Sequence, residues 1–360
     1  MENFIVSARK YRPTTWESVV GQSSITETLK SAIASNHLAQ AFLFTGPRGV
    51  GKTTTARILA KTINRNDLNG EVSDDEDFAF NIFELDAASN NSVDDIRQLI
   101  DQVRIPPQIG SHKVYIIDEV HMLSAAAFNA FLKTLEEPPE HAIFILATTE
   151  KHKVIPTIIS RCQVFDFQRI QIVDIVKYLQ YIAKEEGITA EEDALHTIAQ
   201  KADGGMRDAL SLFDQIVSFS GTTVTYQNVI DNLNILDYEY YFKMTKFIVE
   251  HDASQALVLF NTILEKGFDG HNFINGLASH FRDLLMSGDT NTVELLETTE
   301  GLKKRYFEQT KKCGSVFLLD ALQLLSDADY RYKVSKNQRL LVEICLMQLA
   351  SVTNSGEKKN

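Results

Sequence analysis

The chain has 360 residues, 44% of them hydrophobic, a length and composition that favour two or three domains with buried cores. The formal net charge of −12 excludes a protein that coats nucleic acid by bulk electrostatics, so any DNA contact must be local. No signal peptide or membrane-length apolar span occurs, and we expect a soluble cytoplasmic protein. Cys162, Cys313 and Cys345 are far apart and form no CxxC pair, which argues against a disulfide framework and a four-thiolate zinc site.

Up to Arg169 the chain alternates short β-rich runs with helical stretches, which predicts a parallel sheet with crossover helices. A helix is expected over 53–63, and another after Ser92, where Asp95 three residues on resembles a capping box. A third is expected over 125–137, closed by two prolines. The expected strands are 41–45, 82–85, 114–118, 142–148 and 163–167.

From Ile172 to about Leu233 the β signal fades and helical segments closed by glycine remain. Beyond that, apolar residues recur at spacings of three and four to near the end, which predicts a separate all-helical domain. We therefore expect domains at 1–169, 170–233 and 234–352, with 353–360 as a disordered tail.

The segment GPRGVGKT follows the first strand and opens the first long helix, and it matches the phosphate-binding pattern GxxxxGK[ST]. Backbone N–H groups of the turn and the N-terminal end of the helix would cradle phosphates, Lys52 would reach the β and γ oxygens, and Thr53 would bind Mg²⁺. The pattern also arises by chance, but its position between a strand and a helix favours an ATP site. The predicted nucleotide-binding residues here are Gly46, Pro47, Arg48, Gly49, Val50, Gly51, Lys52, Thr53 and Thr54.

The segment VYIIDEVHML places Asp118 and Glu119 at the carboxyl end of an apolar strand. Alone, such a pair would be a solvated turn. Beside a phosphate-binding turn, Asp118 is the expected outer Mg²⁺ ligand, and Glu119 would polarise the attacking water. His121 is expected to be structural rather than catalytic. The combination predicts ATP hydrolysis.

Several segments, in this order, resemble the gamma/tau family of bacterial clamp-loader ATPases, subunits of DNA polymerase III within the AAA+ superfamily. They are RKYRP, GPRGVGKT, ELDAASNNSVDDIR, VYIIDEVHMLS, FNAFLKTLEEPP, ILATTE, ISRC and GGMRDALSLFDQ, between Arg9 and Gln215. The resemblance implies a P-loop AAA+ domain with a five-stranded parallel sheet, a small helical lid and an all-α collar that joins subunits into a ring.

The resemblance also assigns individual residues. Thr149 falls at sensor 1, which reads the γ-phosphate, with Thr148 as the weaker candidate. Arg207 falls at sensor 2 on the lid. Tyr11 and Arg12 fall in the segment that packs near the adenine.

Arg161, in VIPTIISRCQVFDF, falls at the arginine-finger position. There it would act on the ATP of the next subunit, an effect worth roughly 10³ to 10⁵ in rate in other NTPases. The alternative is a buried arginine paired with a local carboxylate such as Asp166.

For DNA, the resemblance points to Arg97 and Lys133 as contacts with the primer-template backbone. Each would contribute about one unit to the slope of log binding affinity against log salt concentration. The alternative for Arg97 is a partner of Asp94 on the same helix. Family members carry a four-cysteine zinc module where this chain has the cysteine-free, acidic segment 64–81, so no structural zinc is predicted.

The sequence therefore predicts an ATP-hydrolysing clamp-loader subunit whose partners are other subunits of the ring, the sliding clamp and primed DNA. Any nucleotidyltransferase label would belong to the holoenzyme, because no polymerase-type carboxylate site is evident. Two alternatives remain: another AAA+ DNA motor such as a Holliday-junction helicase, and a non-hydrolysing scaffold subunit of the same ring.

Overall fold

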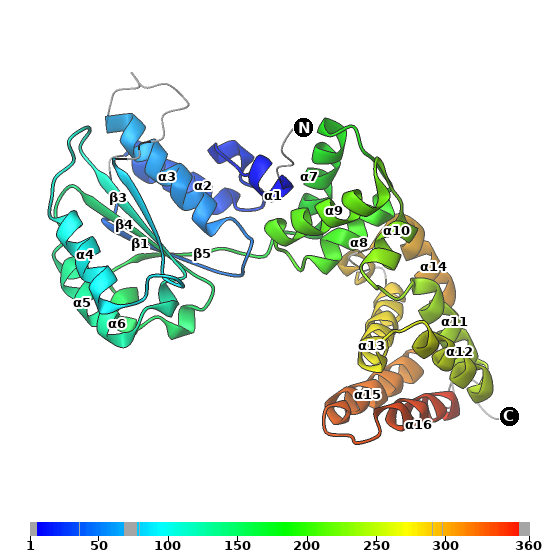
Figure 1. Ribbon diagram of the computed structural model, residues 1–360. Coiled ribbons are helices and arrows are strands. Elements are labelled where there is room, and N and C mark those ends of the chain that lie inside the picture. The colour runs from blue at the N-terminus through cyan, green and yellow to red at the C-terminus, as the bar shows by residue number, and fades with distance from the viewer. Residues whose placement is uncertain are drawn as a thin grey trace. The chain divides into compact units, whose positions relative to one another are not determined.

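The computed structural model describes residues 6–35, 37–67, 78, 80–289, 291–296 and 298–352. The chain forms two compact units (Figure 1). The first joins residues 1–190 with 197–223, and the second joins 191–196 with 224–360. The acidic run Asp74 to Asp77, within segment 64–81, lies outside the described residues, as does the expected tail 353–360. The domain boundaries expected at 169 and 233 stay predictions.

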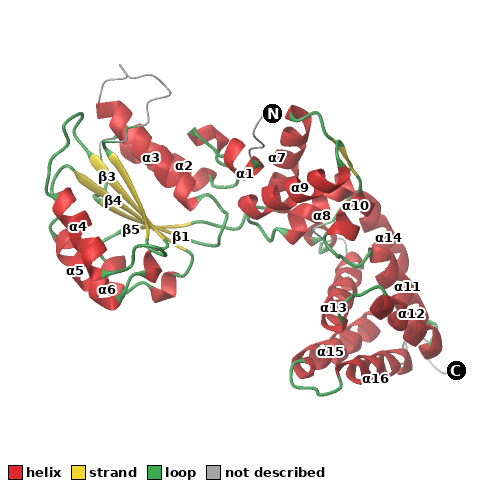
Figure 2. Ribbon diagram, in the orientation of Figure 1, coloured by secondary structure: helices red, strands yellow, loops and turns green. Residues whose placement is uncertain are grey.

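A five-stranded parallel sheet forms the centre of the first unit (Figure 2). Its strand order is β2-β3-β4-β1-β5. This confirms the fold class expected from the sequence. The expected strand bounds are correct for β1 and β4 and differ by one residue for the others. The strands are β1 (Ala41–Thr45), β2 (Ile82–Asp86), β3 (Lys113–Asp118), β4 (Ala142–Thr148) and β5 (Gln163–Asp166).

Helices cover both faces of this sheet (Figure 1). Alternate side chains of a strand point to opposite faces, so Phe42 and Phe44 pack with α2 (Ser23–Ala34) and α3 (Lys52–Asp67). Leu43 lies in the other core, with α4 (Val93–Val103) and α5 (Ala125–Glu136). The capping box predicted at the start of α4 is present, because Ser92 and Asp95 bond to each other's backbone N–H.

Shorter elements and further helices complete the first unit. The chain also forms a two-stranded pair that the sequence did not predict, because each strand is only two residues long. These elements are α1 (Ser7–Lys10), η1 (Trp16–Ser18), η2 (Val120–Met122), η3 (Lys151–Lys153), α6 (Pro156–Ile159), α7 (Ile172–Glu185), β6 (Thr189–Ala190), α8 (Glu192–Lys201), α9 (Met206–Ser220) and β7 (Thr223–Val224), with α8 and β7 shared between the units.

The described residues of the second unit are helical from Tyr226 on, as predicted. Their core gathers around α13 and α15, where Phe273, Leu277, Phe281 and Leu284 are all buried. Nowhere in the described ranges is a helix both long and apolar enough to cross a membrane. The helices are α10 (Tyr226–Asn232), α11 (Tyr238–Val249), α12 (Ala253–Glu265), α13 (Gly270–Ser287), η4 (Val293–Leu295), α14 (Glu300–Thr310), α15 (Ser315–Tyr332) and α16 (Gln338–Ser351).

Candidate active site

The glycine-rich turn predicted to bind phosphate connects β1 to α3. Gly46 has φ +135° and Gly51 has φ +105°, conformations that residues with a side chain rarely adopt. At Gly46 a Cβ atom would also lie 2.3 Å from the Phe167 carbonyl oxygen. The turn therefore needs glycine both for its backbone conformation and for its close approach to the chain that follows β5.

Lys52 is the first residue of α3, and only 6% of it is exposed. Its Nζ donates to the carbonyl oxygens of Gly46 at 2.8 Å and Pro47 at 2.6 Å. Burial lowers the pKa of this ammonium, and the nearby carboxylates of Glu119 and Asp118 oppose that shift. The ammonium is thus held against the turn, facing two acidic groups.

The sheet order explains why Thr53 and Asp118 meet. Strands β1, β4 and β3 are neighbours, and all three end at the same edge. Thr53 Oγ1 donates to Asp118 Oδ2 at 2.7 Å. Adjacent oxygen ligands of one octahedral Mg²⁺ lie about 2.9 Å apart, so this pair fits the metal role predicted for both residues.

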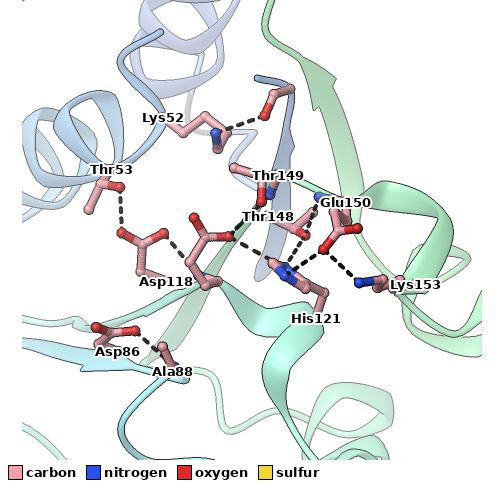
Figure 3. Close-up of polar contacts among 12 residues, drawn as sticks. Lys52, Thr53, Asp86, Ala88, Asp118, His121, Thr148, Thr149, Glu150 and Lys153 are labelled. Atoms are coloured by element: carbon pink, nitrogen blue, oxygen red, sulfur yellow. Dashed lines mark hydrogen bonds and ion pairs between the residues drawn. The ribbon is translucent and has the colours of Figure 1, made fainter. Parts of the chain in front are cut away.

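Glu119 has the left-handed φ of +47°, which is uncommon outside glycine. Its backbone N–H donates to Asp118 Oδ1 at 2.9 Å. Its Oε2 accepts from the Thr149 hydroxyl at 3.0 Å and from the Thr149 backbone N–H at 3.3 Å (Figure 3). The structure thereby brings Glu119 next to Thr149 rather than next to Thr148.

His121 lies behind Glu119, with 6% of its side chain exposed. Its Nδ1 is 3.0 Å from Thr148 Oγ1 and 3.4 Å from Glu119 Oε2, and its Nε2 is 3.1 Å from Glu150 Oε2 (Figure 3). An Nε2–H that donates to Glu150 leaves Nδ1 to accept from the Thr148 hydroxyl. Glu150 also accepts from Lys153 at 2.8 Å, so a continuous set of hydrogen bonds runs from Thr148 through His121 to η3.

A pocket of about 520 Å³ lies over this edge of the sheet, within the size range of small-molecule sites. Most of the predicted residues line it, whereas Gly46, Pro47, Thr149 and Arg161 do not. The predicted residues that line it are Tyr11, Arg12, Arg48, Gly49, Val50, Gly51, Lys52, Thr53, Thr54, Asp118, Glu119 and Arg207.

The N-terminal wall of the pocket is tied to α7 and the residue after it. Tyr178 donates to the Tyr11 carbonyl oxygen at 2.9 Å, and the Tyr11 hydroxyl donates to Glu186. Burial first, and Glu186 second, raise the pKa of Tyr11. On α9, the Arg207 backbone N–H donates to the Gly49 carbonyl at 3.4 Å, so the helix that carries the predicted sensor 2 contacts the phosphate-binding turn directly.

Arg161 lies outside the pocket, just beyond α6. Its Nη2 donates to Glu136 Oε1 at 2.6 Å and its Nη1 to the Thr157 carbonyl at 2.7 Å. The alternative partner considered from the sequence, Asp166, is wrong: that carboxylate bonds to Lys151 at 2.9 Å and to the Thr45 hydroxyl. Arg161 therefore pairs with a local carboxylate, but with 32% of its side chain exposed it is not the buried arginine of that alternative. It lies outside the pocket formed at the glycine-rich turn of its own chain.

The two predicted DNA contacts are exposed on neighbouring helices, Arg97 on α4 and Lys133 on α5. Arg97 lies 3.3 Å from Asp94, the alternative partner expected from the sequence, but both side chains stay mostly exposed. Such a pair contributes little to folding and leaves the guanidinium accessible. In the described part of the chain no three His, Cys, Asp or Glu side chains form a metal-binding group. Most of the acidic segment after α3 is not described.

Sequence reasoning missed Asp86, Glu150 and Glu186. Asp86 lines the pocket and pairs in register with Asp118, and its carboxylate accepts from the Ala88 backbone N–H at 2.9 Å. Its position at the end of a predicted strand was a usable signal. Glu150 and Glu186 act through contacts with residues far along the chain, and no local pattern marks them.

Two family descriptions match the chain: DNA polymerase III, delta subunit, over residues 21–171, and DNA polymerase III clamp loader subunit, ATPase lid domain, over 174–222. DNA polymerase III subunit tau of Bacillus subtilis is 39% identical over 97% of this chain and 63% of its own length. Subunit gamma of Buchnera aphidicola is 33% identical over 97% of this chain and 99% of its own. Subunit tau of Escherichia coli is 40% identical over 74% of this chain and 43% of its own.

Among solved structures, the RuvB Holliday-junction branch-migration motor of Thermotoga maritima has a TM-score of 0.50 at 20% identity. The match covers 67% of this chain and 80% of that one, and it supports the AAA+ fold. The chain spans less than two thirds of the tau subunits but nearly all of the Buchnera gamma subunit. On this sequence similarity, the chain belongs to the DNA polymerase III gamma/tau subunit family.

Proposed function

We propose that the chain is an ATP-hydrolysing subunit of a bacterial clamp loader, which uses ATP to open a sliding clamp and load it onto primed DNA in the cytoplasm. The observation that carries this proposal is the convergence of Lys52, Thr53, Asp118 and Glu119 on one pocket. A lysine and a hydroxyl at the start of α3 and two carboxylates at the end of β3 are the groups that ATP hydrolysis needs. This constellation disfavours a non-hydrolysing scaffold subunit.

Within that site each side chain has a separate role. Lys52 binds the β and γ phosphate oxygens, and the backbone N–H groups of the turn bind the rest of the phosphate chain. Thr53 and Asp118 would hold Mg²⁺, which neutralises charge on the phosphates when it is bound. Glu119 orients and polarises the attacking water, and its bond to Thr149 fixes the direction of its carboxylate.

The remaining predicted residues act around the nucleotide. Tyr11 and Arg12 bind near the base, and Arg207 reaches the phosphates from α9. Arg161 completes the site of the next subunit in a ring, and its position outside the pocket of its own chain supports this role. No structural zinc is proposed. The partners are other clamp-loader subunits, the sliding clamp, and primer-template DNA held in part by Arg97 and Lys133.

The direct test is nucleotide binding by Lys52→Ala, with Lys30→Ala as a matched control on an exposed helix of the same unit. Lys52→Ala should lose ATP binding, while the control keeps the affinity of the parent protein. Steady-state hydrolysis should rise when primed DNA, clamp and the other subunits are added. Unchanged ATP affinity in Lys52→Ala would remove the assignment of the site.

A further inference from the structure

The second unit carries a basic surface that the ATP site does not explain. Residues 300–312 contain Lys303, Lys304, Arg305, Lys311 and Lys312 against Glu300 and Glu308, a net charge of 5 − 2 = +3 in a chain whose net charge is −12. This segment forms α14 and the turn after it. A local excess of positive charge in an acidic protein marks a surface that attracts anions.

Most of these cations lie on the exposed side of α14. The helix buries Tyr306 in the core of the unit, which turns Lys304, Arg305 and Phe307 towards solvent. Phe307 is 50% exposed, and Lys311 Nζ lies 4.3 Å from its ring centroid. The surface therefore combines cations with an accessible aromatic ring.

A pocket of about 490 Å³ lies beside this surface, between α11 and α14. Lys243, Lys246, Arg305 and Lys312 line it, against two acids, Glu250 and Glu308. Thr245 also lines it; this residue is buried, and within the described ranges its hydroxyl has no hydrogen-bond partner. Ammonium groups and a hydroxyl are all donors, so the pocket matches a ligand rich in acceptor oxygens.

Internal pairing accounts for only part of this charge. Arg305 lies 2.6 Å from Glu239, and Lys303 lies 2.8 Å from Glu300. Among the described residues, Lys243, Lys304 and Lys311 have no carboxylate within 4.0 Å. The positive charge of Lys311 is favourable at the C-terminal end of the α14 dipole. That effect does not explain the charges of Lys243 and Lys304.

We propose that α11 and α14 form a binding surface for the phosphate backbone of single-stranded DNA. The exposed Phe307 favours nucleic acid over an acidic peptide, because a ring beside cations offers a stacking surface for a base. The inference rests on the proposed function, since primed DNA carries a single-stranded template. It adds a contact to those proposed for Arg97 and Lys133.

The test measures binding of a labelled single-stranded oligothymidine to the full chain by fluorescence anisotropy, without nucleotide, at several salt concentrations. Each phosphate contact on a single strand contributes about 0.7 to the slope of log affinity against log salt concentration, which corresponds to about 5-fold in affinity at 0.1 M salt. The double variant Lys304→Gln, Lys311→Gln should therefore bind about 25-fold more weakly, with a slope about 1.4 units shallower. The matched control is Lys333→Gln, Lys336→Gln, which removes the same charge from exposed lysines between α15 and α16.

Phe307→Leu gives a second readout, since it should weaken binding about 5-fold or more and leave the salt slope unchanged. Unaltered binding by both the double-lysine variant and Phe307→Leu overturns the proposal. An equal loss of affinity in the control pair also overturns the proposal, because the loss would then come from the overall charge of the chain and not from this surface. A polyglutamate peptide that displaces the DNA at equal charge would assign the surface to an acidic protein instead. Because no nucleotide is present, failure of the ATPase assignment leaves these results unaffected.

Discussion

Replacing Arg161 by alanine separates a role in folding from a role in catalysis. In the structure this side chain is 32% exposed and pairs with Glu136, which is 48% exposed. A pair this accessible to solvent contributes at most about 1 kcal/mol to folding. The variant should therefore stay folded and bind ATP with nearly the affinity of the parent protein.

Catalysis should respond far more strongly. An arginine supplied across a subunit interface accelerates hydrolysis by roughly 10³ to 10⁵, equivalent to about 4 to 7 kcal/mol in the barrier. We expect Arg161→Ala to lose most of the DNA-stimulated ATPase activity of the assembled ring. The assay is steady-state hydrolysis with clamp, primed DNA and all subunits, alongside nucleotide binding and thermal unfolding of the variant alone.

The Glu136 carboxylate provides the matched control. If Arg161 serves only to pair with it, Glu136→Gln should reproduce the Arg161→Ala loss. If the guanidinium acts on a neighbouring subunit, Glu136→Gln should keep hydrolysis within about 3-fold, since the exposed pair is worth little. Equal losses in both variants, or loss of ATP binding in Arg161→Ala, would refute the trans role.

Three further substitutions test the site and the second unit. Glu119→Gln should lower hydrolysis by about 10² to 10⁴ in single-turnover assays while ATP binding is retained. Gly46→Ala should destabilise the first unit by about 3 kcal/mol or more in denaturant unfolding, because alanine disfavours φ +135° and its Cβ would clash with the Phe167 carbonyl. A fully folded, ATP-binding variant would contradict this reasoning. Burial lowers the pKa of His280 to about 3, below its unfolded value, so its contribution to stability is present above about pH 6.5 and is lost as the pH falls towards 3. In this window, the free energy of unfolding of the parent protein should fall by up to about 1.4 kcal/mol per pH unit more than that of His280→Gln. Denaturant titration of the second unit measures this difference, and parallel pH profiles of the two proteins would exclude the effect.

The grouping of residues at the candidate site could be predicted in large part from the sequence because many of them lie at or just after strand ends. In a parallel sheet the carboxyl ends of neighbouring strands share one edge, so finding the strands nearly fixes which side chains meet. Strands β1 and β4 contain no charged residue, and their bounds were predicted correctly. Strand β2 extends one residue further than predicted, to Asp86, and β3 begins one residue earlier, at Lys113. Strand β5 ends one residue earlier, at Asp166. In each case a charged residue lies at the boundary.

The contacts that orient these groups could not be predicted in the same way. Tyr11 and Glu186 meet across 175 residues, and Arg161 and Glu136 across 25, because of how separate helices pack together. Arg161 shows the consequence: an acid close in sequence, Asp166, was the partner named in the alternative, yet it lies on β5 and bonds to Lys151 and Thr45. Charge and closeness in sequence do not choose between two carboxylates, since the choice depends on which carboxylate the fold places beside the arginine. The sequence therefore predicts well which side chains share a site where strand topology brings them together, and poorly where side chains from separate helices must meet.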